Sequence, residues 1–249
     1  MDSFNPFSLK EKTILVTGAS SGIGRQTAIS CSKMGARLVI TGRNEARLNE
    51  TAANLSGDEN IIIPADLTDE ESIRNLVSQL PSLDGIVHCA GIGHRKPAKF
   101  IDAEDIDTVM NTNFKAAVLL QSVVLQKKKL NKNGSVVFIA SKAADFPSVG
   151  NAVYSASKGA IISYAHCLAL ELAPRNTRVN CICPAMVWTD LITQDEVTIE
   201  ELKESEAQYP LKRYGKPEDI ANLSVYLLSE ASGWMTGTCL DITGGSNKL

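Results

Sequence analysis

The stretch that decides the fold is TILVTGASSGIG, residues 13–24. Its first five residues are apolar or β-branched and predict a buried strand. The glycine spacing Gly-x-x-x-Gly-x-Gly follows, and it allows a tight turn with backbone N–H groups close to a ligand. A helix that begins near Gly22 would direct its N-terminus at an anion. This succession predicts a site for a pyrophosphate, and the alternative is a merely structural turn. The residues expected at this site are Gly18, Ser20, Ser21, Gly22, Ile23 and Gly24.

The alternation of strand and helix continues along the whole chain. Strands are predicted at Thr13–Thr17, Arg37–Thr41, Asn60–Pro64, Gly85–Cys89, Ser135–Ala140, Arg178–Cys183 and Thr238–Ile242. Helices are expected to begin near Gly22, Asn44, Asp69, Ala103, Asn151 and Pro217. Parallel strands joined by crossover helices form an open, doubly wound sheet that is covered on both faces. We therefore expect an α/β, Rossmann-type fold with a seven-stranded parallel sheet, in a single domain over residues 1–249.

Length and composition limit the class of protein. The chain has 249 residues, of which 44% are hydrophobic, and can bury a full core. A net charge of -3 argues against nucleic acid as a partner. The first residues, MDSFNP, do not form a basic segment followed by an apolar one, and no apolar run is long enough to span a bilayer. We expect a cytoplasmic protein that does not enter a membrane.

The cysteines and histidines do not have the spacing of metal ligands. The six cysteines lack the Cys-x-x-Cys pattern, and we expect buried free thiols. The three histidines are His88, His94 and His166, and none has a partner at ligand spacing. No metal site is expected.

The end of the second predicted strand bears on the choice of nucleotide. An acidic residue there favours NAD, whereas an arginine accommodates the 2′-phosphate of NADP. The sequence reads VITGR over residues 39–43, so Gly42 takes the place of the acid and Arg43 follows. This pattern favours NADP(H) over NAD(H). The alternative is that Arg43 is a solvated residue at the start of a helix.

Tyr154 and Lys158 are four residues apart, and residues i and i+4 share one face of a helix. A nearby cation stabilises a phenolate, so a phenol beside an ammonium can exchange a proton more easily. Such a pair could act as an acid and base. Tyrosine and lysine at this spacing also occur in ordinary surface contacts, so the surrounding sequence must decide.

These elements together resemble the short-chain dehydrogenase/reductase (SDR) family, from about Lys12 to Gly245. The family's acidic residue near the adenine is matched by Asp66, which Leu67 follows. Its Asn-Asn-Ala-Gly element reads HCAG over residues 88–91, so only Ala90 and Gly91 are kept.

The family element that holds the nicotinamide is Pro-Gly-x-x-x-Thr, which reads PAMVWT over residues 184–189. The resemblance implies cofactor contacts from Pro184, Val187 and Thr189, with Ala185 in place of the glycine.

The resemblance also implies a catalytic tetrad of Asn113, Ser141, Tyr154 and Lys158. Tyr154 would donate a proton to the nascent alkoxide, and Lys158 would support it while holding the nicotinamide ribose. Ser141 would bind the carbonyl oxygen, and Asn113 would anchor a water chain that leads to Lys158. The implied activity is an NAD(P)H-dependent reduction of a ketone, or the reverse oxidation of a secondary alcohol.

The substrate stays open at this level. Residues 188–209 interrupt the rhythm of the strands and are rich in acidic residues, so they predict a partly helical lid or an acidic solvated helix. The overall pattern looks most like the 3-oxoacyl-(acyl-carrier-protein) reductases. The alternatives are an enzyme for a sugar, polyol, steroid or other small alcohol or ketone, and a nucleotide-binding scaffold without catalysis.

Two features bear on partners. Lys127, Lys128, Lys129 and Arg175 could dock an anionic acyl carrier protein, or they could be solvated helix ends. The helix predicted from Asn151 to Leu172 is apolar or small nearly all round, so a second surface is expected to cover it. Because members of the family that this chain resembles bury this helix between subunits, the resemblance implies a homotetramer or a homodimer.

Overall fold

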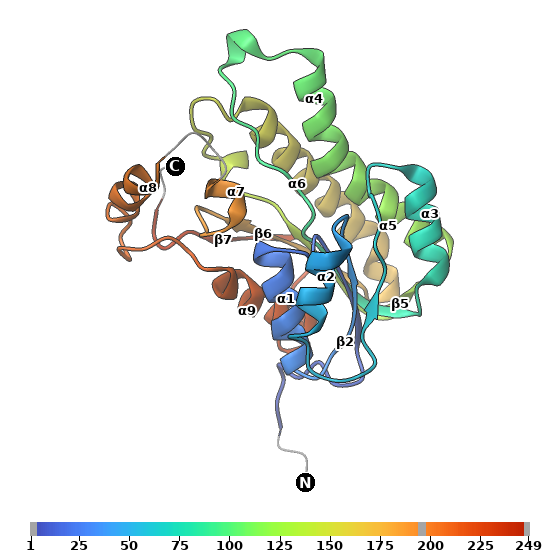
Figure 1. Cartoon of the computed structure of the whole chain (residues 1–249). Coiled ribbons are helices and arrows are strands. Elements are labelled where there is room, and N and C mark those ends of the chain that lie inside the picture. Colours follow the sequence, from blue (N-terminus) through green and yellow to red (C-terminus); the bar gives the residue numbers. More distant parts are fainter. Residues whose placement is uncertain (1–3, 194–197, 247–249) are drawn as a thin grey trace.

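The computed structural model describes residues 4–193 and 198–246, and seven parallel strands form its central sheet (Figure 1). Their order is β3-β2-β1-β4-β5-β6-β7, so the direction of winding reverses between β1 and β4. The predicted doubly wound fold is confirmed. The strand bounds are β1 Thr13–Thr17, β2 Arg37–Thr41, β3 Ile61–Ile62, β4 Leu83–His88, β5 Leu130–Ile139, β6 Arg178–Pro184 and β7 Thr238–Ile242.

Helices cover both faces of the sheet because successive strand side chains point to opposite sides. In β1, Leu15 packs into the core under one helix layer, while Ile14 and Val16 pack into the core on the other face. The first layer consists of α3 (Glu70–Gln79), α5 (Ala116–Gln126) and α6 (Ala152–Leu172). The second consists of α1 (Gly22–Lys33), α2 (Glu45–Ala52) and α9 (Pro217–Leu228). The remaining helices are α4 (Ala103–Met110), α7 (Asp190–Thr193) and α8 (Ile199–Glu206).

Two of the predicted helix starts are side-chain caps. Asn44 accepts a hydrogen bond from Arg47 N at 3.0 Å, and Asp69 accepts one from Ser72 N at 2.9 Å. Each cap satisfies a backbone donor that has no partner inside the helix. Of the helices described, none combines the length and the apolar character needed to cross a membrane.

Four strand predictions differ from the structure, two of them by only one or two residues: β4 is Leu83–His88 instead of Gly85–Cys89, and β6 ends at Pro184 instead of Cys183. The strand expected over Asn60–Pro64 is only Ile61–Ile62, because it lies at the end of the sheet and proline lacks a ladder donor. The strand expected from Ser135 begins at Leu130, and the register with β4 shifts between Leu83 and Gly85. The early start of β5 therefore comes with an irregular stretch in its pairing with β4.

The expectation of buried thiols is wrong for Cys167, which is exposed, and only partly right for Cys89 and Cys239, which are half-buried. Cys167 lies on α6, whose composition is apolar on its outer face as well as its inner one, so residue type could not identify the buried side. All six cysteines are free, as predicted.

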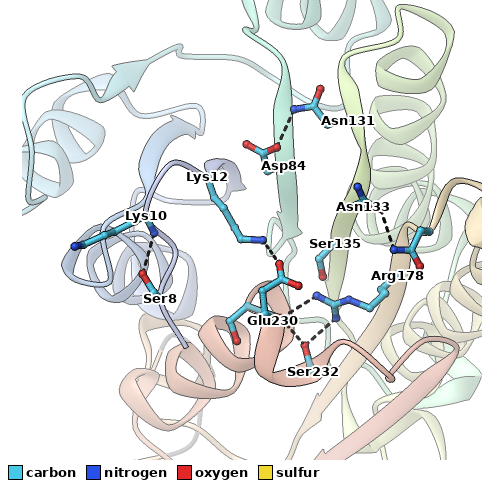
Figure 2. Close-up of polar contacts among 12 residues, drawn as sticks. Ser8, Lys10, Lys12, Asp84, Asn131, Asn133, Ser135, Arg178, Glu230 and Ser232 are labelled. Carbon is cyan, nitrogen blue, oxygen red and sulfur yellow. Dashed lines mark hydrogen bonds and ion pairs between the residues drawn. The ribbon is translucent and has the colours of Figure 1, made fainter. Parts of the chain in front are cut away.

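A polar clamp joins the amino ends of the strands to the segment after α9 (Figure 2). Arg178, at the start of β6, donates to the carbonyls of Leu227 at 2.8 Å and Ser229 at 3.1 Å, and to Ser232 Oγ at 2.8 Å. Lys12 forms an ion pair with Glu230 at 2.6 Å. These contacts hold the amino ends of the strands in place, at the opposite end of the sheet from the carboxyl ends.

We expect Arg178→Met to lower the free energy of unfolding by about 2–4 kcal/mol, because it removes three charge-assisted hydrogen bonds to acceptors on buried residues. The matched control is Arg37→Met, since Arg37 is exposed and donates to a single carbonyl, that of Glu59. That change should stay within about 0.5 kcal/mol. Urea unfolding of both variants measures the difference, and equal losses would contradict a structural role of the clamp.

Candidate active site

An open cleft of about 1800 Å³ lies along the carboxyl ends of the strands, where the strand order reverses. This is the usual place for a ligand in a doubly wound sheet. Every residue predicted to contact the cofactor lines it, and so do Ser141, Tyr154 and Lys158. Asn113, with 2% of its surface exposed, lies behind the wall of the cleft.

The glycine turn is packed too closely for side chains. A Cβ at Gly18 would lie 2.9 Å from the backbone N and Cα of Ala90, and Gly18 has a φ of 64°. A Cβ at Gly24 would lie 2.3 Å from the carbonyl oxygen of Gly18. The N-cap of α1 is Ser21, whose side chain accepts no capping hydrogen bond in the described structure. The first N–H groups of α1 are therefore left to bind an anion in the cleft.

Thr17 is a site residue that the sequence reasoning missed. Its hydroxyl accepts hydrogen bonds from Cys89 N at 3.0 Å and from Ala90 N at 3.1 Å. It thereby ties the end of β1 to the end of β4 next to the glycine turn. A threonine at the last position of the first strand was the available signal, but β-branched residues are ordinary in strands.

Arg43 and Asp66 lie together at one end of the cleft, where they also line an adjoining cavity of about 320 Å³. The N–H and the hydroxyl of Thr68 donate to Asp66 at 2.9 and 2.7 Å. These bonds hold the pKa of the Asp66 carboxyl below its usual value, and the charge of Arg43 adds to the effect. The end of the cleft thus offers both a carboxylate and a guanidinium to a nucleotide.

Arg47 is a second residue that the sequence reasoning missed. It lines the cleft from α2 and forms an ion pair with Asp190 of α7, at 3.2 Å between Nη2 and Oδ2. The pair joins the start of the 188–209 segment to the nucleotide end of the cleft. The sequence gives no signal for this ion pair, because Arg47 and Asp190 are 143 residues apart.

The predicted pairing of Tyr154 and Lys158 on one helix face is confirmed in α6. Lys158 Nζ lies 5.8 Å from the centre of the Tyr154 ring and donates to the carbonyl of Ile139 at 2.9 Å. Ser141 follows the end of β5, and its hydroxyl accepts a hydrogen bond from Ala143 N at 3.1 Å. A phenol, an ammonium and a hydroxyl from two adjacent elements therefore line one part of the cleft.

Asn113 lies in a π-helical segment, Asn111–Lys115, between α4 and α5. Its oxygen accepts from Ile92 N at 2.8 Å, and its nitrogen donates to Ile92 O at 3.0 Å and to Ser157 Oγ at 3.1 Å. Asn113 Oδ1 and Lys158 Nζ would lie 3.2 and 3.5 Å from a Cβ at Gly91. The structure thus brings Asn113 and Lys158 together behind Gly91, where a Cβ would be in tight contact with Asn113.

His88 is part of the core. Its Nε2 lies 3.0 Å from Gln121 Oε1, and its ring stacks on Phe138 at 4.5 Å. Burial lowers the pKa of His88 to about 4, so the ring is neutral at pH 7. Across the described part of the chain, no three His, Cys, Asp or Glu side chains form a possible metal site.

The 188–209 segment contains α7 and α8, and its residues 194–197 lie outside the described part. Leu202, Tyr209 and Tyr214 form a small core, against which Trp188 packs. Glu206 accepts from Trp188 Nε1 and from Tyr214 N, both at 2.8 Å, and these bonds lower the pKa of its carboxyl. At least this acidic residue therefore has a structural role.

Two of the four cations considered for carrier docking are bound to backbone carbonyls. Lys129 donates to Leu80 O, and Arg175 donates to Leu130 O. Lys127 and Lys128 are exposed.

Known proteins are similar to this chain over nearly its whole length. The sequence model described as enoyl-(acyl carrier protein) reductase matches residues 18–247. The 3-oxoacyl-(acyl-carrier-protein) reductase of Rickettsia bellii is 35% identical over 237 residues, which cover 95% of this chain and 97% of the relative. The L-xylulose reductase of Caenorhabditis elegans is 32% identical over 244 residues, covering 96% and 97%.

The chain is also similar to a solved structure. It is described as a candidate NAD(P)-dependent gluconate 5-dehydrogenase from Beutenbergia cavernae with NADP bound at low occupancy. It has a TM-score of 0.87 and 32% identity to this chain, and the alignment covers 97% of this chain and 98% of that one.

The contact between the ends of β1 and β4 can be tested by replacing Thr17, with Thr41 as the matched control. They are register partners at the ends of β1 and β2, with 1% and 0% of their surfaces exposed. We expect Thr17→Val to lower the free energy of unfolding by about 1–3 kcal/mol, because two N–H groups lose their acceptor. The Thr41 hydroxyl has no hydrogen-bond partner in the described structure, so Thr41→Val should be neutral or stabilising. Thermal or urea unfolding compares the two, and equal effects would contradict the role of Thr17.

Proposed function

The chain belongs to the short-chain dehydrogenase/reductase family, and on that basis we propose that this oxidoreductase reduces the ketone of a 3-oxoacyl thioester carried by acyl carrier protein. The observation that carries the proposal is the grouping of Ser141, Tyr154 and Lys158 in one cleft with the glycine turn. The first of the two relatives compared above is a reductase of this kind.

The described residues fit a nicotinamide dinucleotide. The turn at Gly18 and Gly24 would be filled by any Cβ, and the uncapped start of α1 suits a pyrophosphate. Pro184, Val187 and Thr189 line the cleft at the end of β6, where they would hold the nicotinamide. When bound, the cofactor supplies the hydride.

The protein's part in the proposed mechanism is to hold the carbonyl and move one proton. Ser141 donates a hydrogen bond to the carbonyl oxygen, and the Tyr154 hydroxyl gives that oxygen its proton as the alkoxide forms. The ammonium of Lys158 stabilises the phenolate that remains, since it lies 5.8 Å from the ring centre. Lys158 also holds the nicotinamide ribose.

Asn113 has a positioning role in this proposal. Its contacts with Ile92 and Ser157 fix the loop after β4 against α6. In the proposed mechanism Asn113 anchors a water chain through which protons return from solvent to Lys158.

We propose a preference for NADP(H) over NAD(H), supported by Arg43 at the end of the cleft beside Asp66. An arginine there can bind a 2′-phosphate with two parallel hydrogen bonds. The similar structure described with bound NADP supports the same choice.

A second candidate is the reduction of a ketone derived from a sugar or polyol. A steroid or another small alcohol or ketone would be a further alternative substrate for the same type of enzyme. One relative is an L-xylulose reductase, and one similar structure is described as a candidate gluconate 5-dehydrogenase. The third candidate, a scaffold without catalysis, is disfavoured by the presence of both Tyr154 and Lys158 in the cleft.

We also propose a homotetramer or homodimer built on the outer face of α6. On that helix Leu170 has 79% of its surface exposed, Cys167 is exposed and Gly159 is half-buried, with the polar His166 beside them. A monomeric mass by light scattering would contradict this assembly. For a carrier partner, Lys127 and Lys128 remain available as docking cations.

The activity is tested by following NADPH absorbance with acetoacetyl thioesters of acyl carrier protein and coenzyme A, beside sugar and polyol ketones. We expect the thioesters to be reduced, and Tyr154→Phe to lose about 10²–10⁴-fold in kcat because the ring keeps its packing but lacks the proton donor. NADPH affinity, measured by fluorescence, serves as the control and should change little. Preferential turnover of a sugar ketone would favour the second candidate, and an undiminished Tyr154→Phe would exclude the proposed acid.

Cofactor preference is tested with Arg43→Met. The variant should weaken NADPH binding by about 10- to 100-fold, because a charge-assisted contact with the 2′-phosphate is lost. NADH lacks this phosphate, so its affinity is the internal control. An equal loss for both nucleotides, or none for either, would contradict the role of Arg43.

A further inference from the structure

Three consecutive basic residues, His94, Arg95 and Lys96, lie on the loop that follows β4, and the first two line the cleft. Asp105 Oδ1 lies 3.0 Å from His94 Nε2, and Lys96 Nζ forms ion pairs with Asp105 and, at 3.0 Å, with Asp102. The outer two residues are therefore held by carboxylates at the start of α4. Arg95 forms no hydrogen bond or ion pair within the structure as described.

The backbone makes room for Arg95 at Gly150. A Cβ at Gly150 would lie 3.2 Å from Arg95 Cγ and 3.8 Å from its Nε, and the φ of Gly150 is 88°. Lys96 N donates to Gly150 O at 2.8 Å, so the two loops are joined at this point. Both Arg95 and Gly150 line the cleft.

This position is close to the proposed chemistry. Gly150 precedes Tyr154 by four residues, so their Cα atoms are at most about 14 Å apart even in a fully extended chain. An arginine side chain over Gly150 can therefore reach a group on the same small molecule whose carbonyl meets Tyr154.

No acidic residue in the described part of the cleft forms an ion pair with Arg95. Among the described lining residues, the acidic ones are Asp66, Asp190 and Glu201. Asp66 accepts from Thr68, Asp190 pairs with Arg47, and Glu201 accepts from the N–H and hydroxyl of Thr198. A guanidinium that has no partner among the described residues, on the wall of a cleft, is suited to a carboxylate or a phosphate because it can donate two parallel hydrogen bonds.

We propose that Arg95 binds an anionic oxygen group of the substrate, a carboxylate or a phosphate, while the ketone lies at Tyr154. The inference rests on the proposed function and narrows its substrate class to carbonyl compounds that carry an anion. Such a group has two sources: the carboxylate of a small oxo acid and the phosphates of a pantetheine thioester.

Paired substrates separate these sources. The first pairs are 3-oxobutanoate and 5-oxohexanoate, each with its methyl ester, which has no charge. The second pair is acetoacetyl coenzyme A and acetoacetyl-N-acetylcysteamine, which lacks the phosphates. For Arg95→Met we expect the ratio of kcat/KM for the anionic member to that for the neutral member to fall about 10- to 100-fold in one set of pairs.

Two further variants control for charge. Arg95→Lys keeps the cation and should recover part of the ratio, although it loses the two-point contact. Arg74→Met removes the same charge from the exposed face of α3, where Arg74 pairs with Glu70, and should leave the ratio unchanged.

The outcomes are distinct. A fall only with the oxo acids assigns the site to a carboxylate, and a fall only with coenzyme A assigns it to a phosphate. No fall, or equal losses for the charged and neutral members, overturns the proposal.

Equilibrium binding separates this inference from the proposed function. Calorimetry measures binding of the same oxo acids and of coenzyme A to the wild type and to Arg95→Met, both saturated with NADP⁺. Anion binding that depends on Arg95, without turnover, would refute the proposed reaction and support the site. Turnover whose selectivity is independent of Arg95 would support the proposed reaction and refute the anion site. Absence of anion binding to the wild type would also refute the anion site.

Discussion

The close approach of two strand ends is the constraint on which the rest of this structure depends. The turn after β1 touches the backbone at Ala90, so that a Cβ at Gly18 would be only 2.9 Å away, and the Thr17 hydroxyl binds two N–H groups of the same segment. This contact sets where α1 begins and therefore where its free N–H groups point. It also fixes the start of the loop that carries Gly91, Ile92 and Arg95.

The two ends of the sheet have different roles: contacts at the amino ends stabilise the fold, and the residues at the carboxyl ends line the cleft. At the amino ends, Arg178 and the Lys12–Glu230 pair hold strands to the segment after α9, away from the cleft (Figure 2). At the carboxyl ends, strands stop at polar residues such as Ser141, and α6 places Tyr154 and Lys158 in its first turns. These groups come from α6 and from the residues after β5, and the 188–209 segment supplies none of them.

Much of the fold and the central part of the site could be predicted because their signals are local. The spacing of Gly18, Gly22 and Gly24, and of Tyr154 and Lys158, fixes backbone and helix-face relations within a few residues. The strand edges were harder, because the short β3 depends on its place at the sheet edge and the early start of β5 on its register with β4. Thr17 and Arg47 were missed because their partners, Ala90 and Asp190, are distant in sequence.

The order of strands and helices, the tight glycine turn and the position of Tyr154 and Lys158 on one helix face could all be inferred from the sequence, because each depends on residues close together in the chain. Which charges are already paired became known only from the folded structure. His94, Arg95 and Lys96 are equivalent as a basic run, yet Asp102 and Asp105 hold the first and third and leave the second facing the cleft. Pairing depends on distances between elements that fold together, and the order of residues along the chain does not contain those distances directly.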